Sequence, residues 1–189
     1  MPASSFLHAA RTSRGWSQRE LARRCGVAQP SLSDIETGDR DTTVAKLEQI
    51  LRATGHRLVS IPTTRPTVAE WALALRDEAD RPAVVNKSLV EFSNDLRGAE
   101  PTTAIALTIA APETTNDQRV DAALAAIVDH SLVQRGLPTP TWVDEPSRFS
   151  SVEWDLIEHP DLRLAARATV PRAFARRNVY IPREFFDSV

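Results

Sequence analysis

The chain has 189 residues, of which 42% are hydrophobic and 25% charged, and its formal net charge is −2. Such a composition is ordinary for a globular protein with one large domain or two small ones. It contains no apolar run near the ~20 residues that a membrane-spanning helix needs and no signal-peptide pattern, so we expect a cytoplasmic protein without a membrane anchor. The single cysteine, Cys25, excludes an internal disulfide and is expected to be a small buried residue.

Charge is unevenly divided along the chain. Residues 1–65 hold ten Lys and Arg against six Asp and Glu, a net +4, whereas residues 66–189 hold thirteen against nineteen, a net −6. A basic first third suits a polyanionic partner such as nucleic acid. Because the excess is small, attraction to phosphates alone would be weak and salt-dependent unless two copies act together.

The first third of the chain predicts helices over residues 4–13, 18–24, 29–36 and 44–53. Ser17 can cap the second helix, with Glu20 completing a capping box, and Gly26 permits a sharp turn before the third. In the third helix, Leu32 and Ile35 are three residues apart and face inward. Its outward residues are therefore Gln29, Ser31, Ser33 and Asp34. The fourth helix is expected to be buried through Val44, Leu47, Ile50 and Leu51.

The pattern of the second and third helices is Ser17-Gln18-x-x-Leu21-Ala22-x-x-x-Gly26-Val27-x-Gln29-x-x-Leu32-Ser33-x-Ile35-Glu36-x-Gly38. It resembles the XRE-type helix-turn-helix family of phage-repressor and Cro-like proteins, and the resemblance covers residues 4–61. The resemblance implies a DNA-binding domain of five-helix type that acts as a homodimer on a double-stranded operator. It also implies a partly buried ion pair between Arg11 and Glu36.

The family's DNA-reading positions can be carried over one by one. Gln29 would read adenine through its amide, and Asp34 could accept a hydrogen bond from cytosine. Gln18 and Thr43 would hold backbone phosphates. The full set of DNA-binding residues that the resemblance implies is Ser17, Gln18, Gln29, Ser31, Ser33, Asp34, Arg40, Thr43 and Lys46. Pro30 and Ala28 depart from the usual residues at their positions, which leaves open a domain that binds protein instead.

After the fourth helix, residues 56–61 are partly β-branched and end at proline, as a single strand would. A lone strand needs a partner, because its edge would otherwise be exposed. Pairing with the same strand of a second chain, as in HipB-type antitoxins of this family, is favoured over pairing within one chain. Residues 62–66 hold two prolines and no apolar side chain and are expected to link two domains, 1–61 and 67–189.

The second domain is predicted to be mostly helical. A capping box of Thr67 and Glu70 opens it, and Asp117 can cap its clearest helix. Residues 102–111 fit a buried helix or strand, with helix favoured. The other predicted helices span residues 68–79, 82–98, 117–134, 161–168 and 171–176, with a last helical turn over 183–188 and extended segments over 137–142 and 178–182.

A second resemblance comes from three segments in order: Asp121-x-x-Leu124-x-x-Ile127-x-x-His130, Gly136-Leu137-Pro138-x-Pro140-x-Trp142-Val143 and Pro171-x-x-Phe174-x-x-Arg177-x-Val179-x-Ile181. This order is similar to the carboxy-terminal body of XRE-type regulators that accompany nucleotidyltransferase-like toxins in bacterial toxin–antitoxin pairs. Its motifs are mainly packing residues, so the resemblance implies a partner and supplies no site.

Nothing in the sequence predicts catalysis. The four histidines are scattered without metal-ligand spacing, and no phosphate-binding loop or serine-hydrolase motif occurs, so we expect no catalytic residue, no metal and no cofactor. The tripeptide at residues 159–161 matches J-domain co-chaperones but lacks their helical hairpin. Arginines 172, 176, 177 and 183 are open to two interpretations, a phosphate-binding surface or pairs with local acids such as Glu184 and Asp187.

The leading prediction is thus a sequence-specific transcriptional regulator, an antitoxin that represses its own operon while its second domain binds the toxin. One alternative is a regulator whose second domain senses a small molecule, which a closed pocket lined by Trp71, Phe92 or Trp142 would favour. Another is a phage-defence or scaffold protein without operator specificity.

Overall fold

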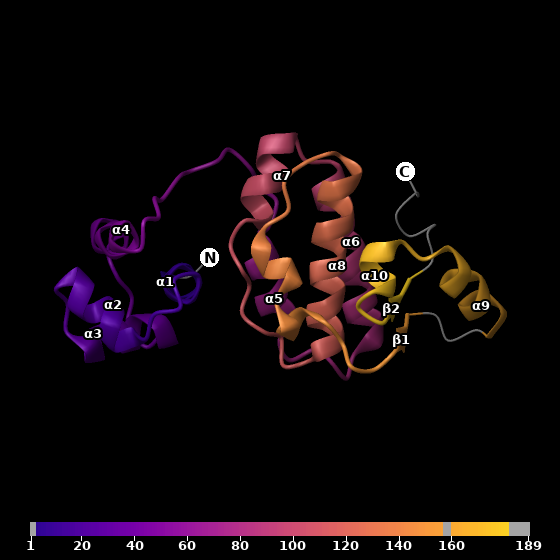
Figure 1. Ribbon diagram of the computed structural model, residues 1–189, viewed down its shortest axis with the longest axis horizontal. Helices are drawn as coiled ribbons and strands as arrows, with labels where there is room; N and C mark the ends of the chain where they lie inside the picture. Colours follow the sequence, from indigo (N-terminus) through magenta and orange to yellow (C-terminus); the bar gives the residue numbers. More distant parts are fainter. Residues whose placement is uncertain (1–2, 157–159, 182–189) are drawn as a thin grey trace. The chain divides into compact units, whose positions relative to one another are not determined.

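A computed structural model describes residues 3–156 and 160–181 of the chain, which forms two compact units, Met1–Pro62 (unit 1) and Thr63–Val189 (unit 2). Figure 1 shows that both are built mainly from helices, which confirms the predicted mainly α fold class. In the described residues, strands are limited to a two-stranded pair in unit 2. No helix among these residues is long and apolar enough to span a membrane.

Unit 1 consists of four helices that lie close to the predicted ranges. They are α1 (Ala3–Thr12), α2 (Gln18–Cys25), α3 (Gln29–Thr37) and α4 (Val44–Ala53). Helices α1 and α2 each pack against both α3 and α4. Their shared core is formed by the residues Leu7, Ala10, Leu21, Ala22, Cys25, Leu32, Ile35, Leu47, Ile50 and Leu51.

The turn between α2 and α3 is fixed by local chemistry. Ser17 caps α2 by accepting a hydrogen bond from the backbone N–H of Glu20, as predicted. Gly26 ends α2 with φ of 65°, a left-handed conformation that side chains with a Cβ rarely adopt. The predicted capping box is wrong, because the Glu20 carboxylate accepts hydrogen bonds from the arginines one turn along, Arg23 and Arg24.

Three other expectations for this part of the chain differ from the structure. Val44 is 67% exposed, because it is the first residue of α4 and points away from the core. Residues 56–61 form no strand within the described chain, and pairing with a second copy stays a prediction. A fifth helix does not occur before Pro62, since the next helix belongs to unit 2.

The described residues of unit 2 form ten short and long elements. These are the helices α5 (Val68–Leu75), α6 (Pro82–Arg97), α7 (Pro101–Thr108), α8 (Gln118–Gln134), α9 (Pro160–Thr169) and α10 (Arg172–Ala175), the 3₁₀ turns η1 (Thr141–Asp144) and η2 (Pro146–Arg148), and the strands β1 (Trp154–Asp155) and β2 (Val179–Tyr180). The predicted capping box of Thr67 and Glu70 is present at the start of α5. Residues 102–111 are helical up to Thr108, which confirms the favoured assignment.

Helix α8 is the centre of unit 2. It contacts α5, α6, α7, α10, both 3₁₀ turns and β2, and Figure 1 shows it running through the middle of the unit. Every residue from Val120 to Val128 is buried, a pattern expected for a helix covered on all sides. Asp117 caps it as predicted, by accepting a hydrogen bond from the N–H of Arg119.

The carboxy-terminal part of unit 2 departs most from expectation. Strand β1 was not predicted; it pairs in parallel with β2, Trp154 beside Val179 and Asp155 beside Tyr180. Helix α5 ends at Leu75, four residues before the predicted end, and part of the segment expected to be extended forms η1. The predicted turn over residues 183–188, Arg183 with its acids, and His159 of the co-chaperone-like tripeptide lie outside the described residues.

Candidate nucleic-acid interface

The recognition helix α3 is held to the rest of unit 1 by its apolar side. Leu32 and Ile35 are buried in the core, as predicted from their spacing. Gln29, at the start of the helix, and Asp34, further along it, are both exposed. Ala28, at the N-cap of α3, has no side chain that can accept a hydrogen bond, so it leaves the backbone N–H groups of the first turn uncapped. The start of α3 thus presents a polar side chain from a rigid support.

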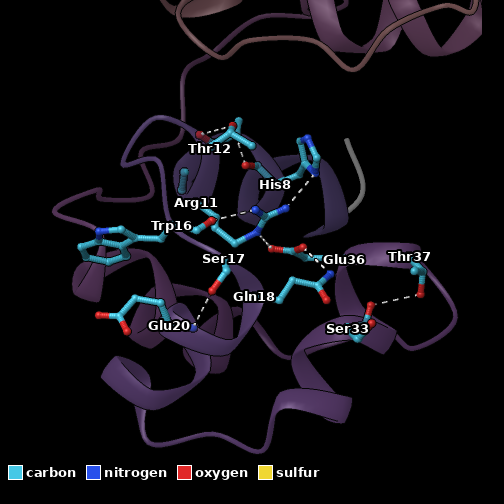
Figure 2. A network of polar contacts seen from close by, with 12 residues as sticks. His8, Arg11, Thr12, Trp16, Ser17, Gln18, Glu20, Ser33, Glu36 and Thr37 are labelled. Atoms are coloured by element: carbon cyan, nitrogen blue, oxygen red, sulfur yellow. Dashed lines mark hydrogen bonds and ion pairs between the residues drawn. The ribbon is translucent and has the colours of Figure 1, made fainter.

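A polar network joins the first three helices through Glu36, near the carboxy-terminal end of α3 (Figure 2). Arg11 of α1 donates through Nε to Glu36 Oε1 of α3 at 2.8 Å and through Nη1 to the carbonyl of Trp16 at 2.9 Å. Gln18 of α2 donates through Nε2 to Glu36 Oε2, also at 2.8 Å. The predicted ion pair is confirmed, with side-chain exposures of 14% for Arg11 and 3% for Glu36. Both oxygens of the buried carboxylate are therefore satisfied, and the helices are fixed to one another.

The predicted DNA-binding residues fall into two groups in the structure. Some have polar atoms already engaged: Ser17 and Thr43 cap their helices, Gln18 donates to Glu36, and Lys46 donates to Gln49 at 3.3 Å. The side chains that remain available are those of Gln29, Ser31, Ser33, Asp34 and Arg40, of which the two serines are half-buried and the other three exposed.

Part of the positive charge of unit 1 is already paired with acids of the same unit. Arg11 pairs with Glu36 and Arg52 with Glu48, whereas Arg23 and Arg24 share the single carboxylate of Glu20. The cations without an ion pair among the described residues of unit 1 are Arg14, Arg19, Arg40, Lys46 and Arg57. Arg14 donates instead to the carbonyl of Thr54 at 2.7 Å. Phosphate contact therefore depends on a few single cations, which strengthens the expectation that two copies act together.

Arg19 was not singled out by the sequence pattern, although it follows Gln18 directly. It is exposed and has no ion pair among the described residues, whereas the next two arginines of α2 are both held by Glu20. The spacing of Glu20 three and four residues before those arginines is the signal that could have found it. Arg19 is the cation of α2 best able to reach a phosphate.

Other chemistry is not evident in the part of the chain that the structure describes. Cys25 is buried, and burial raises the pKa of its thiol, as expected for a core residue. No group of His, Cys, Asp and Glu side chains among the described residues could hold a metal ion.

With the geometry described, comparison with known proteins identifies the class of unit 1. Residues 7–58 match a family model described as helix-turn-helix, a range that begins inside α1 and ends five residues after α4. Unit 1 therefore contains an XRE-family helix-turn-helix domain, which supports a DNA-binding transcriptional regulator. Searches of curated proteins and of solved structures give no match to the chain.

Proposed function

We propose that the protein is a sequence-specific transcriptional repressor of its own operon, and that it is an antitoxin. The observation that carries the first part is Gln29, exposed at the start of a recognition helix whose core side and flanks are fixed by packing and by the bonds to Glu36. A helix that is already held in place loses little conformational entropy on binding, so the side chain it presents can contribute to discrimination between bases.

In this function the Gln29 amide donates to N7 and accepts from the N6 amine of an adenine in the major groove. Asp34, exposed further along α3, accepts from the N4 amine of a cytosine. Arg40 and Arg19 supply phosphate contacts that set the position without reading sequence. Two copies placed on a palindromic operator put their recognition helices about one helical turn, ~34 Å, apart.

The antitoxin role is assigned to unit 2, which has its own core and so can serve a second partner. We infer that this partner is a toxin protein encoded beside it. The sensor alternative stays a prediction. Two of its three candidate lining residues, Phe92 and Trp142, are buried in the core, and Trp71 packs on Phe92 with ring centroids 6.1 Å apart.

The first test is a gel-shift titration of the full chain on a fragment of its own promoter, with unrelated DNA of equal length as competitor. Gln29→Ala should reduce the preference for the promoter by about 1–3 kcal/mol, which corresponds to roughly 5-fold to 150-fold, with a small change on the competitor. Gln134→Ala removes the same amide from an exposed position at the end of α8, in unit 2, and serves as the matched control. An unchanged preference in Gln29→Ala would remove base reading by this residue.

The second test separates the antitoxin role from DNA binding. Cells expressing the product of the adjacent gene should stop growing, and co-expression of the wild type should restore growth. Gln29→Ala should restore growth equally well while failing to repress a promoter fusion. If the neighbour's product is harmless, or harmful and not neutralised, the antitoxin role is wrong and the repressor role is unaffected.

A further inference from the structure

A groove of about 780 Å³ opens on the surface of unit 2, lined by α6, α8, α10 and the segment that precedes α10. Its volume lies in the range of small-molecule sites. Figure 1 shows α8 and α10 side by side, in agreement with their contacts. The charged residues of its described lining are Arg97, Arg135, Arg172 and Arg176 with a single acid, Asp129. A positive groove is unexpected in the part of the chain with a net charge of −6.

The acid of the groove is already neutralised. Asp129 accepts hydrogen bonds from Arg176 at 2.6 Å and from the fully buried Arg177 beneath it at 2.9 Å. Burial by itself raises the pKa of Asp129, but these two guanidinium groups hold that pKa below its ordinary value. Arg176 also pairs with Asp144 at 2.7 Å. Two arginines and two aspartates thus form a balanced network that adds no net charge to the groove.

Two further arginines add charge that no acid balances. Arg135, half-buried just after α8, donates through Nη1 to the carbonyl of Leu96 at 2.8 Å and through Nη2 to that of Ala99 at 2.7 Å. These carbonyls fix the guanidinium in place but carry only partial charges. Arg172 is exposed at the start of α10. Neither Arg135 nor Arg172 has a carboxylate partner among the described residues, so the groove has one positive group held by carbonyls and one exposed to solvent.

We propose that this groove binds a small organic oxyanion with two or more negative charges, as found in phosphate esters and polycarboxylates. Guanidinium groups pair with phosphate and carboxylate oxygens in a fork geometry, and a guanidinium already held in place loses little entropy on binding. Arg135 provides the fixed contact, and Arg172 closes on the anion from α10. The inference concerns unit 2 alone and goes beyond the proposed function, because neither DNA nor toxin binding requires it.

The test is isothermal titration of the full chain at low salt with pyrophosphate, ATP, citrate and adenosine as probes. At least one of the three polyanions should bind with a Kd of about 100 µM or tighter, and uncharged adenosine should not. Pyrophosphate and citrate separate phosphate from carboxylate recognition. Since no DNA is present, failure here leaves the repressor proposal standing, and failure of DNA binding leaves this proposal standing.

Variants locate the binding within the groove. Arg172→Glu, at an exposed position, should weaken binding by about tenfold or more, and Arg135→Gln should also weaken it in protein that retains its helical circular dichroism. Arg81→Glu makes the same charge change at the opposite, exposed end of α6 and should alter the Kd by less than about twofold. Two results would overturn the proposal: no polyanion binds, or Arg81→Glu weakens binding as much as Arg172→Glu.

Discussion

The two units use buried charge differently. In unit 1 a buried ion pair fixes the helix that carries the candidate interface, whereas in unit 2 a fully buried arginine holds the core elements together. In unit 1 the buried pair of Arg11 and Glu36 joins α1 to the carboxy-terminal end of α3 (Figure 2). In unit 2, Arg177 is fully buried and ties Asp129 of α8 to the carbonyls of Val143 in η1 and Ala173 in α10. The first pair orients a candidate interface, whereas the second holds three elements together.

The largest effect confined to one unit is expected for Arg177→Met. Removing the guanidinium leaves two carbonyls unsatisfied and half of the Asp129 contacts empty, so unit 2 should lose about 3–5 kcal/mol of unfolding free energy. Unit 1 should be unaffected. Denaturant unfolding resolved by amide hydrogen exchange measures each unit separately. If amide protection against exchange were lost equally in both units, the units would unfold together and would not be independent in stability.

Arg11→Ala should cause the next largest loss of unfolding free energy, and this loss should be confined to unit 1. It leaves the Glu36 carboxylate, 3% exposed, with Gln18 as its remaining side-chain partner, for a cost of about 2–3 kcal/mol. Promoter affinity should fall with it, since α3 loses its tie to α1. Arg52→Ala breaks an exposed pair with Glu48 and should cost less than about 0.5 kcal/mol, which makes it the matched control. Equal losses in the two variants would show that the Glu36 network does not support the helix.

Much of unit 1 was predictable because its signals are local. The structure confirms three such signals, each of which acts within a few residues. Ser17 caps α2, Gly26 forms the turn that follows it, and the spacing of Leu32 and Ile35 fixes the buried face of α3. The failure at Glu20 is also local, since two arginines within one turn compete for its carboxylate. Which of the predicted residues contact DNA could not be read from the sequence, because that depends on a partner.

Unit 2 was less predictable because its decisive contacts are distant in sequence. Arg177 was grouped with other arginines as a surface or paired with nearby acids, but its carboxylate partner is Asp129, 48 residues away. Strand β1 is two residues long, too short to give a period, and exists because β2 passes beside it. Helix α8 and the capping box at Thr67 were predictable since a long apolar run and a four-residue motif are local signals.

Removal of a helix cap should cause a smaller loss of stability, of similar size in the two units. Thr67→Ala removes a complete capping box from unit 2, whereas Ser17→Ala removes a single cap bond from unit 1. Each should cost about 1 kcal/mol, with Thr67→Ala the larger because the Glu70 carboxylate then loses a partner as well. Thermal unfolding of the two variants measures the difference. A larger loss for Ser17→Ala would mean that the start of α2 depends on its cap more than the packing of unit 1 suggests.

The smallest predicted effect is a dependence on pH in unit 2. Asp155 of β1 accepts hydrogen bonds from Arg167 and Arg163, which lower its pKa from 3.8 to about 2. A pKa depressed in the folded state stabilises the protein above the unfolded value, so this contribution is present above about pH 4 and is lost as the pH falls towards 2. Asp155→Asn should therefore be less stable than the wild type at pH 7, by about 1 kcal/mol or less because water screens the partly exposed arginines. The difference in unfolding free energy between the two proteins should narrow between pH 4 and pH 2. A difference that stays constant over that range would show that Asp155 acts through side-chain packing and not through its charge.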